Sequence, residues 1–328
     1  MLRIHFTSRD LARVTISARS DPLWEILFSG FRLQERHRAV IYRPWLAMLG
    51  AGSRPVAAPI RVGRTVLEVL APRGPYFPDF LTPPAGRHGL DAGLDALCRT
   101  PRRELHRQLT ILARRRPLPS WVTPLGDGKP DALSGLADTM RRYHAAAIAP
   151  HTEMIEQSVA ADYAHRTHRL VTGGVDGLLA SMRPLMRWQP PVLEVDYGVD
   201  RDLQLDGRGL RLVPSYFCQR LPVSLADPEL PPVLVYPIAQ QFAWSPATRR
   251  LASLDKLIGA TRGAVLRTIG SGATTTELAR TVNVSLASVS RHTTVLRNAG
   301  LVRCDREGGA ILHTLTSLGR ALVEAEQG

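Results

Sequence analysis

The sequence is poor in cysteine. Only three cysteines occur in 328 residues, Cys98, Cys218 and Cys304, and they lie far apart. An odd, scattered set of thiols excludes a disulfide framework and a zinc ribbon. It is typical of proteins of the reducing cytoplasm.

Long apolar runs are also missing. No run approaches 18 residues, so a membrane-spanning helix is excluded. The first ten residues alternate polar and apolar side chains, and we therefore expect no secretory signal. Hydrophobic residues make up 44% of the chain and charged residues 22%, which excludes wholesale disorder and a coiled-coil rod. We expect a cytoplasmic, nucleoid-associated globular protein of two or three domains.

Lysine is almost absent, yet the chain is strongly basic. Lys129 and Lys256 are its only lysines among 42 basic residues, and the net charge is +13. Such an excess favours a polyanionic partner. A membrane surface is the weaker alternative, because no basic cluster borders a large apolar helical face.

Motifs of known catalytic machinery are lacking. The chain has no Gly-x-Ser-x-Gly elbow, no phosphate-binding loop ending in Lys-Ser/Thr and no His-Glu-x-x-His. Ser215 and Cys218 lie beside a predicted strand end, but the sequence identifies no base partner. We therefore expect no enzyme, no catalytic residue and no cofactor.

Periodicity divides the chain into three regions. Residues 1–131 predict a helical, proline-rich region, with helices over 22–33, 89–97 and 102–112. Residues 132–245 predict two helices, the second ending before Gly173-Gly174, and then a small antiparallel β region. Within the latter, Asp206–Gly209 predicts a hairpin turn into 210–213. We expect both regions to form one sensor or dimerisation module, linked by a hinge at 245–250 to residues 246–328.

Residues 251–328 predict three helices, a hairpin and a last helix. Thr274 and Glu277 have the spacing of a capping box at the start of the second helix. Ser285 is a suitable N-cap for a third helix that ends near Asn298. The hairpin that follows turns at 306–309 and forms a wing. The expected fold is thus α+β, with a helix-rich N-terminal module followed by a winged helix-turn-helix.

The third helix has a face suited to DNA. Its outward positions carry small residues and arginine, so the helix can settle into the major groove while Arg291 reaches a guanine edge or a phosphate. Arg306, at the tip of the predicted wing, would contact the flanking backbone. The predicted DNA-binding residues are Ser285, Ala287, Ser288, Ser290, Arg291, His292, Thr294, Arg297, Arg303 and Arg306.

Two sets of segments resemble a known family. Val284–Val302 resembles the recognition helix and turn of ArsR-type winged helix-turn-helix repressors, and Leu315–Leu322 resembles their closing segment. Gly74–Pro83 and Pro191–Tyr197 resemble the long N-terminal region, of unknown function, of actinobacterial ArsR-like regulators. The resemblance implies a bacterial transcription regulator, a homodimeric repressor that binds an imperfect inverted repeat in double-stranded DNA. It leaves open an effector, either a small molecule or a protein.

The metal sites of that family are not expected here. Metal-sensing members use a Cys-x-Cys on the second helix, where this chain has Glu277-Leu-Ala-Arg280, or acid and histidine ligands on the last helix, where it has no histidine. His165 and His168 share a helical face with Asp162, and a solvated face is favoured over a metal pair. Cys304 is expected to be an ordinary small residue rather than a redox sensor.

Other features keep alternative interpretations open. The basic stretch over 99–116 is either a solvated surface, a second DNA-backbone contact or a site for an anionic ligand or partner. The loop carrying Tyr76, Phe77 and Phe80 belongs to the core or forms a ligand lid. The chain as a whole has rival functions: an adaptor whose winged helix docks proteins, an architectural DNA binder without sequence preference, or an enzyme fused to a DNA-binding domain.

Overall fold

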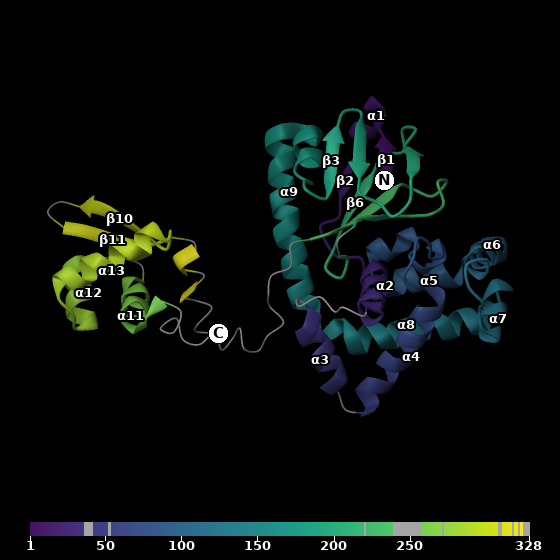
Figure 1. Cartoon of the computed structure of the whole chain (residues 1–328), viewed down its shortest axis with the longest axis horizontal. Coiled ribbons are helices and arrows are strands. Elements are labelled where there is room, and N and C mark those ends of the chain that lie inside the picture. Colours follow the sequence, from purple (N-terminus) through teal and green to yellow (C-terminus); the bar gives the residue numbers. More distant parts are fainter. Residues whose placement is uncertain are drawn as a thin grey trace. The chain divides into compact units, whose positions relative to one another are not determined.

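The computed structural model describes residues 1–35, 42–51, 54–219, 221–238, 258–270, 272–307, 310–316, 318–320 and 322–323 (Figure 1). The side chains of 43, 44, 51, 54–56, 306, 307 and 310 are outside the description as well. Two compact units, Met1–Gln241 and Phe242–Gly328, make up the chain. The predicted hinge at 245–250 lies outside the described residues. Within the described part, no helix has both the length and the apolar character needed to cross a membrane.

Helices dominate the N-terminal unit. The predicted helices over 22–33, 89–97 and 102–112 form as α2, α5 and α6, each within one residue of the expected bounds. Asp21 caps α2, accepting the Leu23 N–H at 3.2 Å, and Pro22 occupies its first turn. The helices are α1 (Ser8–Leu11), α2 (Pro22–Leu33), α3 (Arg43–Ala51), α4 (Arg54–Leu70), α5 (Leu90–Cys98), α6 (Arg102–Ala113), α7 (Thr123–Gly126), α8 (Pro130–Ala147) and α9 (Thr152–Ala180).

Helices α3 and α4 were not expected from the sequence. Pro59 lies inside α4, and an internal proline removes a helical hydrogen bond, which argues against a helix on local grounds. Tertiary packing overrides that cost. At Gly63 of α4, a Cβ would lie 2.6 Å from the ring of Tyr143 on α8, so the two helices meet closely there. The Tyr143 hydroxyl lies 3.0 Å from that of Ser29 on α2, which joins the three helices in one core.

Two four-stranded sheets complete the N-terminal unit, and both include strands from the chain start. The first has the order β3-β4-β1-β5, and the second β2-β6-β8-β7. β3–β4, β1–β4 and β7–β8 are antiparallel, whereas β1–β5, β2–β6 and β6–β8 are parallel. The strands are β1 (Leu2–His5), β2 (Thr15–Ile16), β3 (Met186–Gln189), β4 (Val192–Val195), β5 (Arg201–Gln204), β6 (Arg211–Ser215), β7 (Val223–Ser224) and β8 (Val233–Pro237).

Two predictions about the strands of this unit need correction. The β region expected to be antiparallel also contains three parallel pairs, β1–β5, β2–β6 and β6–β8. The turn at 206–209 forms, with positive φ at Asp206, Gly207 and Gly209, but it is not a hairpin. The strands on either side of it, β5 and β6, lie in different sheets, because each pairs with a strand from the chain start. The helix predicted to stop before Gly173-Gly174 does end there, because α9 consists of two helices that meet at a kink where Gly174 has non-helical backbone angles (φ 62°, ψ −164°).

Among its described residues, the C-terminal unit contains three long helices, a small sheet and helical residues at 318–320 and 322–323, where the last helix was predicted. Helix α11 (Ala260–Ile269) ends at Gly270, while residues 251–257 lie outside the described residues. Strands β10 (Val302–Glu307) and β11 (Ala310–Leu315) pair antiparallel as the predicted wing. A third strand, β9 (Ala273–Thr274), pairs with β11. Helices α12 (Thr275–Val282) and α13 (Leu286–Asn298) lie between β9 and β10 in the chain.

Candidate nucleic-acid interface

Helices α12 and α13 are each held at their N-termini by the predicted caps. The Thr274 backbone N–H donates to Glu277 Oε2 at 2.7 Å, and the Glu277 N–H donates to Thr274 Oγ1 at 3.3 Å. Between the helices Asn283 adopts the left-handed conformation (φ 56°), which asparagine tolerates well. Ser285 Oγ then accepts the Ser288 N–H at 3.2 Å. These local contacts fix where α13 begins.

One face of α13 is buried in the core of the C-terminal unit. Val289, Thr293 and Leu296 are at most 3% exposed, as the sequence predicted. The Thr293 hydroxyl donates to Val289 O at 3.0 Å, so this polar side chain is satisfied within the helix. Leu278 of α12 and Val265 of α11 belong to the same apolar cluster. The buried face therefore fixes which residues α13 presents outward.

The opposite face of α13 carries the predicted contact residues. Most of them are exposed, and Ser288 and His292 are half-buried. Arg303 is exposed on β10, whereas the side chain of Arg306 lies outside the described residues. The exposed members of the predicted set are Ser285, Ala287, Ser290, Arg291, Thr294, Arg297 and Arg303.

The outward face is positively charged without local compensation. Arg280, Arg291, Arg297 and Arg303 make no ion pair with any carboxylate in the described part of the chain. Guanidinium groups that are not paired within the protein remain available for phosphate oxygens or base edges. This distribution is the electrostatic footprint expected for DNA rather than for a structural ion-pair network.

His292 adds a neutral polar group to this surface. Burial, together with the nearby Arg262 and Arg291, lowers the pKa of its imidazole below the ordinary value. The ring is therefore uncharged at neutral pH and acts as a hydrogen-bonding group. Arg262, on α11, was not among the predicted contacts, because only the fold brings it close to His292.

Leu286 is the other residue that the sequence prediction omitted. It is the first residue of α13 and is 54% exposed, beside Ala287 and Ser290 on the outward face. The signal was available, since an apolar residue directly after an N-cap serine lies at the end of a recognition helix that enters the groove first. Apolar side chains there contact the methyl group of thymine.

The wing is tied to α12 through a buried histidine. His313 of β11 is 3% exposed, and its Nδ1 and Nε2 lie 3.1 Å from Cys304 Sγ and 2.9 Å from Thr275 Oγ1. Burial lowers the pKa of His313 and raises that of Cys304, so the thiol is protonated at neutral pH. Cys304 thus belongs to a packing contact, in agreement with the ordinary role expected for it.

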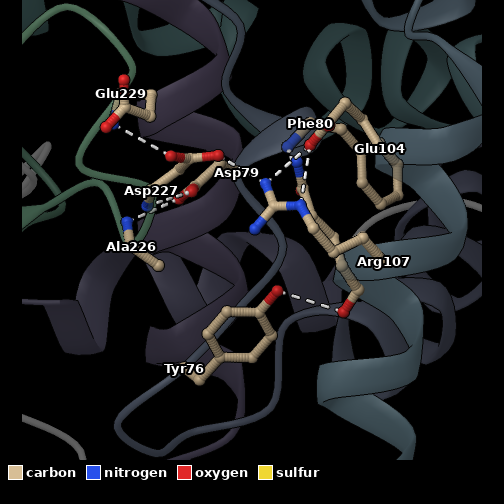
Figure 2. A network of polar contacts seen from close by, with 9 residues as sticks. Tyr76, Asp79, Phe80, Glu104, Arg107, Ala226, Asp227 and Glu229 are labelled. Carbon is tan, nitrogen blue, oxygen red and sulfur yellow. Dashed lines mark hydrogen bonds and ion pairs between the residues drawn. The ribbon is translucent and has the colours of Figure 1, made fainter.

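The basic stretch over 99–116 is largely engaged with the N-terminal unit itself. Arg107 contacts Glu104 at 2.6 Å and also the carboxylate of Asp227 (Figure 2). Asp79 accepts the N–H groups of Ala226 and Asp227 at 2.9 and 2.8 Å, which joins the 226–229 segment to the same network. These contacts favour a structural role over a second DNA contact.

Two other candidate sites from the sequence can be placed in the structure. Tyr76, Phe77 and Phe80 are at most 9% exposed, which identifies their loop as core rather than a lid. His165 and His168 are exposed, while the Asp162 carboxylate is engaged by Tyr236 at 2.6 Å and Arg166 at 3.2 Å. Among the residues described, no cluster of three or more histidine, cysteine or acidic side chains is arranged to hold a metal ion.

Ser215 does have a carboxylate neighbour, which the sequence did not reveal. Its hydroxyl donates to Glu25 Oε2 at 3.1 Å, and it accepts the Cys218 N–H at 3.1 Å. Ser215, Glu25 and Cys218 are all at most 1% exposed. Burial raises the pKa of the Cys218 thiol. A buried serine that is hydrogen-bonded on both sides closes a turn and offers no accessible nucleophile.

Comparison with known proteins supports the C-terminal assignment. A family model described as a helix-turn-helix domain matches residues 260–305, the span from α11 to β10. No curated protein and no solved structure matched the chain. The geometry and the family match agree, and the C-terminal unit contains a helix-turn-helix domain of the DNA-binding kind.

Proposed function

We propose that this protein is a sequence-specific DNA-binding transcription regulator. The observation that carries the proposal is the outward face of α13, in which small residues and Arg291 stand exposed with no carboxylate pairing them. Small side chains allow close approach of the helix to the floor of the major groove, and Arg291 then has the reach and fork geometry for a guanine.

The remaining groups have separate tasks in this mechanism. Arg297 and Arg303 contact phosphates and so fix the position of the helix without reading sequence. Thr294 and Ser290 supply hydroxyls to either base edges or phosphates. Arg306, whose side chain lies outside the described residues, would contact the flanking backbone from the β10–β11 wing. His313 couples the wing to α12, and one apolar cluster packs Leu278 of α12, Val289 of α13 and Val302 of the wing together.

We further infer that the regulator is a homodimeric repressor of the ArsR type, in the cytoplasm. Support comes from the resemblance of Val284–Val302 to the recognition segment of that family and from the winged topology of the C-terminal unit. A two-fold dimer would bind half-sites about one helical turn apart in an imperfect inverted repeat. The N-terminal unit would dimerise, sense an effector, or both, and the effector acts by binding two arrangements of the dimer unequally.

Selection of genomic fragments by the full-length protein tests this function. The selection is run at two salt concentrations with wild type, Arg291→Ala and Arg103→Ala. Arg103 is a matched control, since it is an exposed arginine of the N-terminal unit that pairs with no described carboxylate. We expect wild type and Arg103→Ala to enrich the same fragments with a shared inverted repeat, and Arg291→Ala to lose them.

Other outcomes select between the rival functions. Enrichment without a shared motif indicates an architectural DNA binder. Absence of enrichment at either salt concentration favours the protein-docking adaptor and contradicts the proposal. The buried state of Ser215 and Glu25 supports the further proposal that the chain is not an enzyme.

A further inference from the structure

A cleft in the N-terminal unit is rich in arginine and proline. It has a volume of about 490 Å³ and lies where β2, the beginning of β6, the beginning of β8 and the 3₁₀ helix η3 (Pro84–His88) meet. Four arginines and one histidine line it, together with several apolar residues, and no carboxylate does. The charged and titratable lining residues are Arg13, Arg87, His88, Arg208 and Arg211.

Two of the guanidinium groups are held in place by backbone carbonyls. Arg208 donates from Nε to Leu205 O at 2.9 Å and from Nη2 to Gln204 O at 2.5 Å, and its Nη1 reaches Pro228 O. Arg13 donates from Nη1 to Gly207 O at 2.9 Å. A carbonyl oxygen orients a guanidinium group but carries no formal charge. The positive charges of Arg13 and Arg208 therefore stay uncompensated in the cleft.

Arg87 is one of three exposed arginines of the cleft, with Arg13 and Arg208. Its Nε donates to His88 Nε2 at 2.8 Å. No ion pair joins it to a described carboxylate. Its terminal nitrogens are thus free to donate to an incoming group without breaking a salt bridge.

Among these four arginines, Arg211 alone pairs with a carboxylate of the described residues, and the pairing is long. Its Nη2 lies 3.9 Å from Oδ2 of Asp21, which is 2% exposed and also caps α2. Burial raises the pKa of Asp21 to about 6, although Arg211 lowers it. Burial and the neighbouring Arg87 depress the pKa of Arg211 in spite of Asp21. The cations of the cleft repel one another, and an anion placed between them removes that repulsion.

We propose that this cleft binds a small organic molecule carrying a multiply charged oxyanion, either a phosphate or a polycarboxylate. The volume lies in the range of small-molecule sites. Arginine forks match the geometry of both oxyanions, and the prolines supply a rigid apolar wall for the body of the ligand. The arginines converge on one hollow rather than following an extended stripe, which favours a compact ligand over the backbone of a nucleic acid.

This site supplies a ligand class for the effector of the proposed regulator. Its existence does not depend on DNA binding, because every lining residue belongs to the N-terminal unit. Ligand binding and DNA binding are therefore measured separately, and failure of one leaves the other intact.

Calorimetric titration of the full-length protein tests the inference. Pyrophosphate is the phosphate probe and citrate the polycarboxylate probe, each at an ionic strength matched with sodium chloride. Arg87→Ala is compared with Arg103→Ala, which removes the same charge from an exposed position outside the cleft. We expect saturable binding of at least one probe, weakened about tenfold or more by Arg87→Ala and less than twofold by Arg103→Ala.

A second measurement covers the case in which Arg87→Ala does not fold, as judged by its thermal melt. Wild-type protein is modified with phenylglyoxal, and mass spectrometry maps the labelled arginines with and without the probe. Protection of Arg87 supports the site. Three results would overturn the proposal. They are the absence of saturable binding heat for either probe, an equal loss of probe affinity in both variants, and labelling of Arg87 that does not change when a probe binds. Loss of DNA affinity in Arg87→Ala without oxyanion binding would make the cleft a DNA contact instead.

Discussion

Glu25 lies where the helical core meets the second sheet, and its titration should govern the stability of that junction. The side chain is 1% exposed. Its carboxylate accepts the N–H groups of Tyr216 and Phe217 at 2.8 and 3.0 Å and the hydroxyl of Ser215 at 3.1 Å. Burial nevertheless raises its pKa from 4.5 to about 7, because the three hydrogen bonds do not fully offset desolvation. The substitution Glu25→Gln keeps the size and removes the titration.

The magnitude follows from linkage. A carboxyl group whose pKa is raised by folding contributes stability that is fully present below pH 4.5 and is lost as the pH rises through 7. The interval between the two pKa values corresponds to about 3 kcal/mol. We therefore expect the free energy of unfolding of the wild type, minus that of Glu25→Gln, to fall by about 3 kcal/mol between pH 4.5 and 8.

Urea unfolding of both proteins across this pH range measures the difference. Asp21 also titrates here, but it is present in both proteins, so its contribution largely cancels. Glu153→Gln, on the exposed surface of α9, should show a flat difference. Hydrogen exchange of the Tyr216 and Phe217 amides reports on the same site locally. A difference that stays constant or rises with pH would refute the reasoning and show that the hydrogen bonds outweigh burial.

The remaining predictions concern the C-terminal unit. Arg291→Ala should weaken the free energy of specific DNA binding by about 1–3 kcal/mol and relax the base preference at one position, because one bidentate contact is lost. An unchanged operator affinity would show that Arg291 on α13 does not contact the bases. Arg306→Ala should weaken binding to all sequences alike and reduce the slope of log K against log salt by about one; a sequence-dependent loss contradicts a backbone role. Replacement of thymine by uracil at one operator position should weaken DNA binding by the wild type but not by Leu286→Ala, as measured by competition binding. If both proteins respond equally, Leu286 does not contact that methyl group. Thr274→Ala should lower the stability of the C-terminal unit by about 0.5–2 kcal/mol in thermal unfolding, because the capping box is lost, and an unchanged melt would show that packing alone holds α12.

Local chemistry made the helix-turn-helix predictable from the sequence. The capping box at Thr274, the N-cap at Ser285 and the buried positions Val289 and Leu296 depend on neighbours within one or two turns. The same holds for α2, which begins at Asp21-Pro22. Short-range hydrogen bonds and helical periodicity suffice for such elements.

The sheets and the cleft, in contrast, depend on contacts between distant segments. Local alternation predicted strands near 190–213, but not that Leu2–His5 would pair with Val192–Val195 and Arg201–Gln204 and so send β5 and β6 to different sheets. The pairing of such distant segments depends on how the whole chain packs, because a long loop must close before they meet. The local periodicity of hydrophobic residues does not predict which segments pair.

The sequence by itself therefore predicted the helix-turn-helix of the C-terminal unit and which residues α13 turns outward, since these depend on caps and spacing. Only the tertiary structure decided that Glu25 meets Ser215 and that Arg13, Arg87, Arg208 and Arg211 share one hollow. Their charges are far apart along the chain, and the folded backbone alone brings them within reach of one ligand.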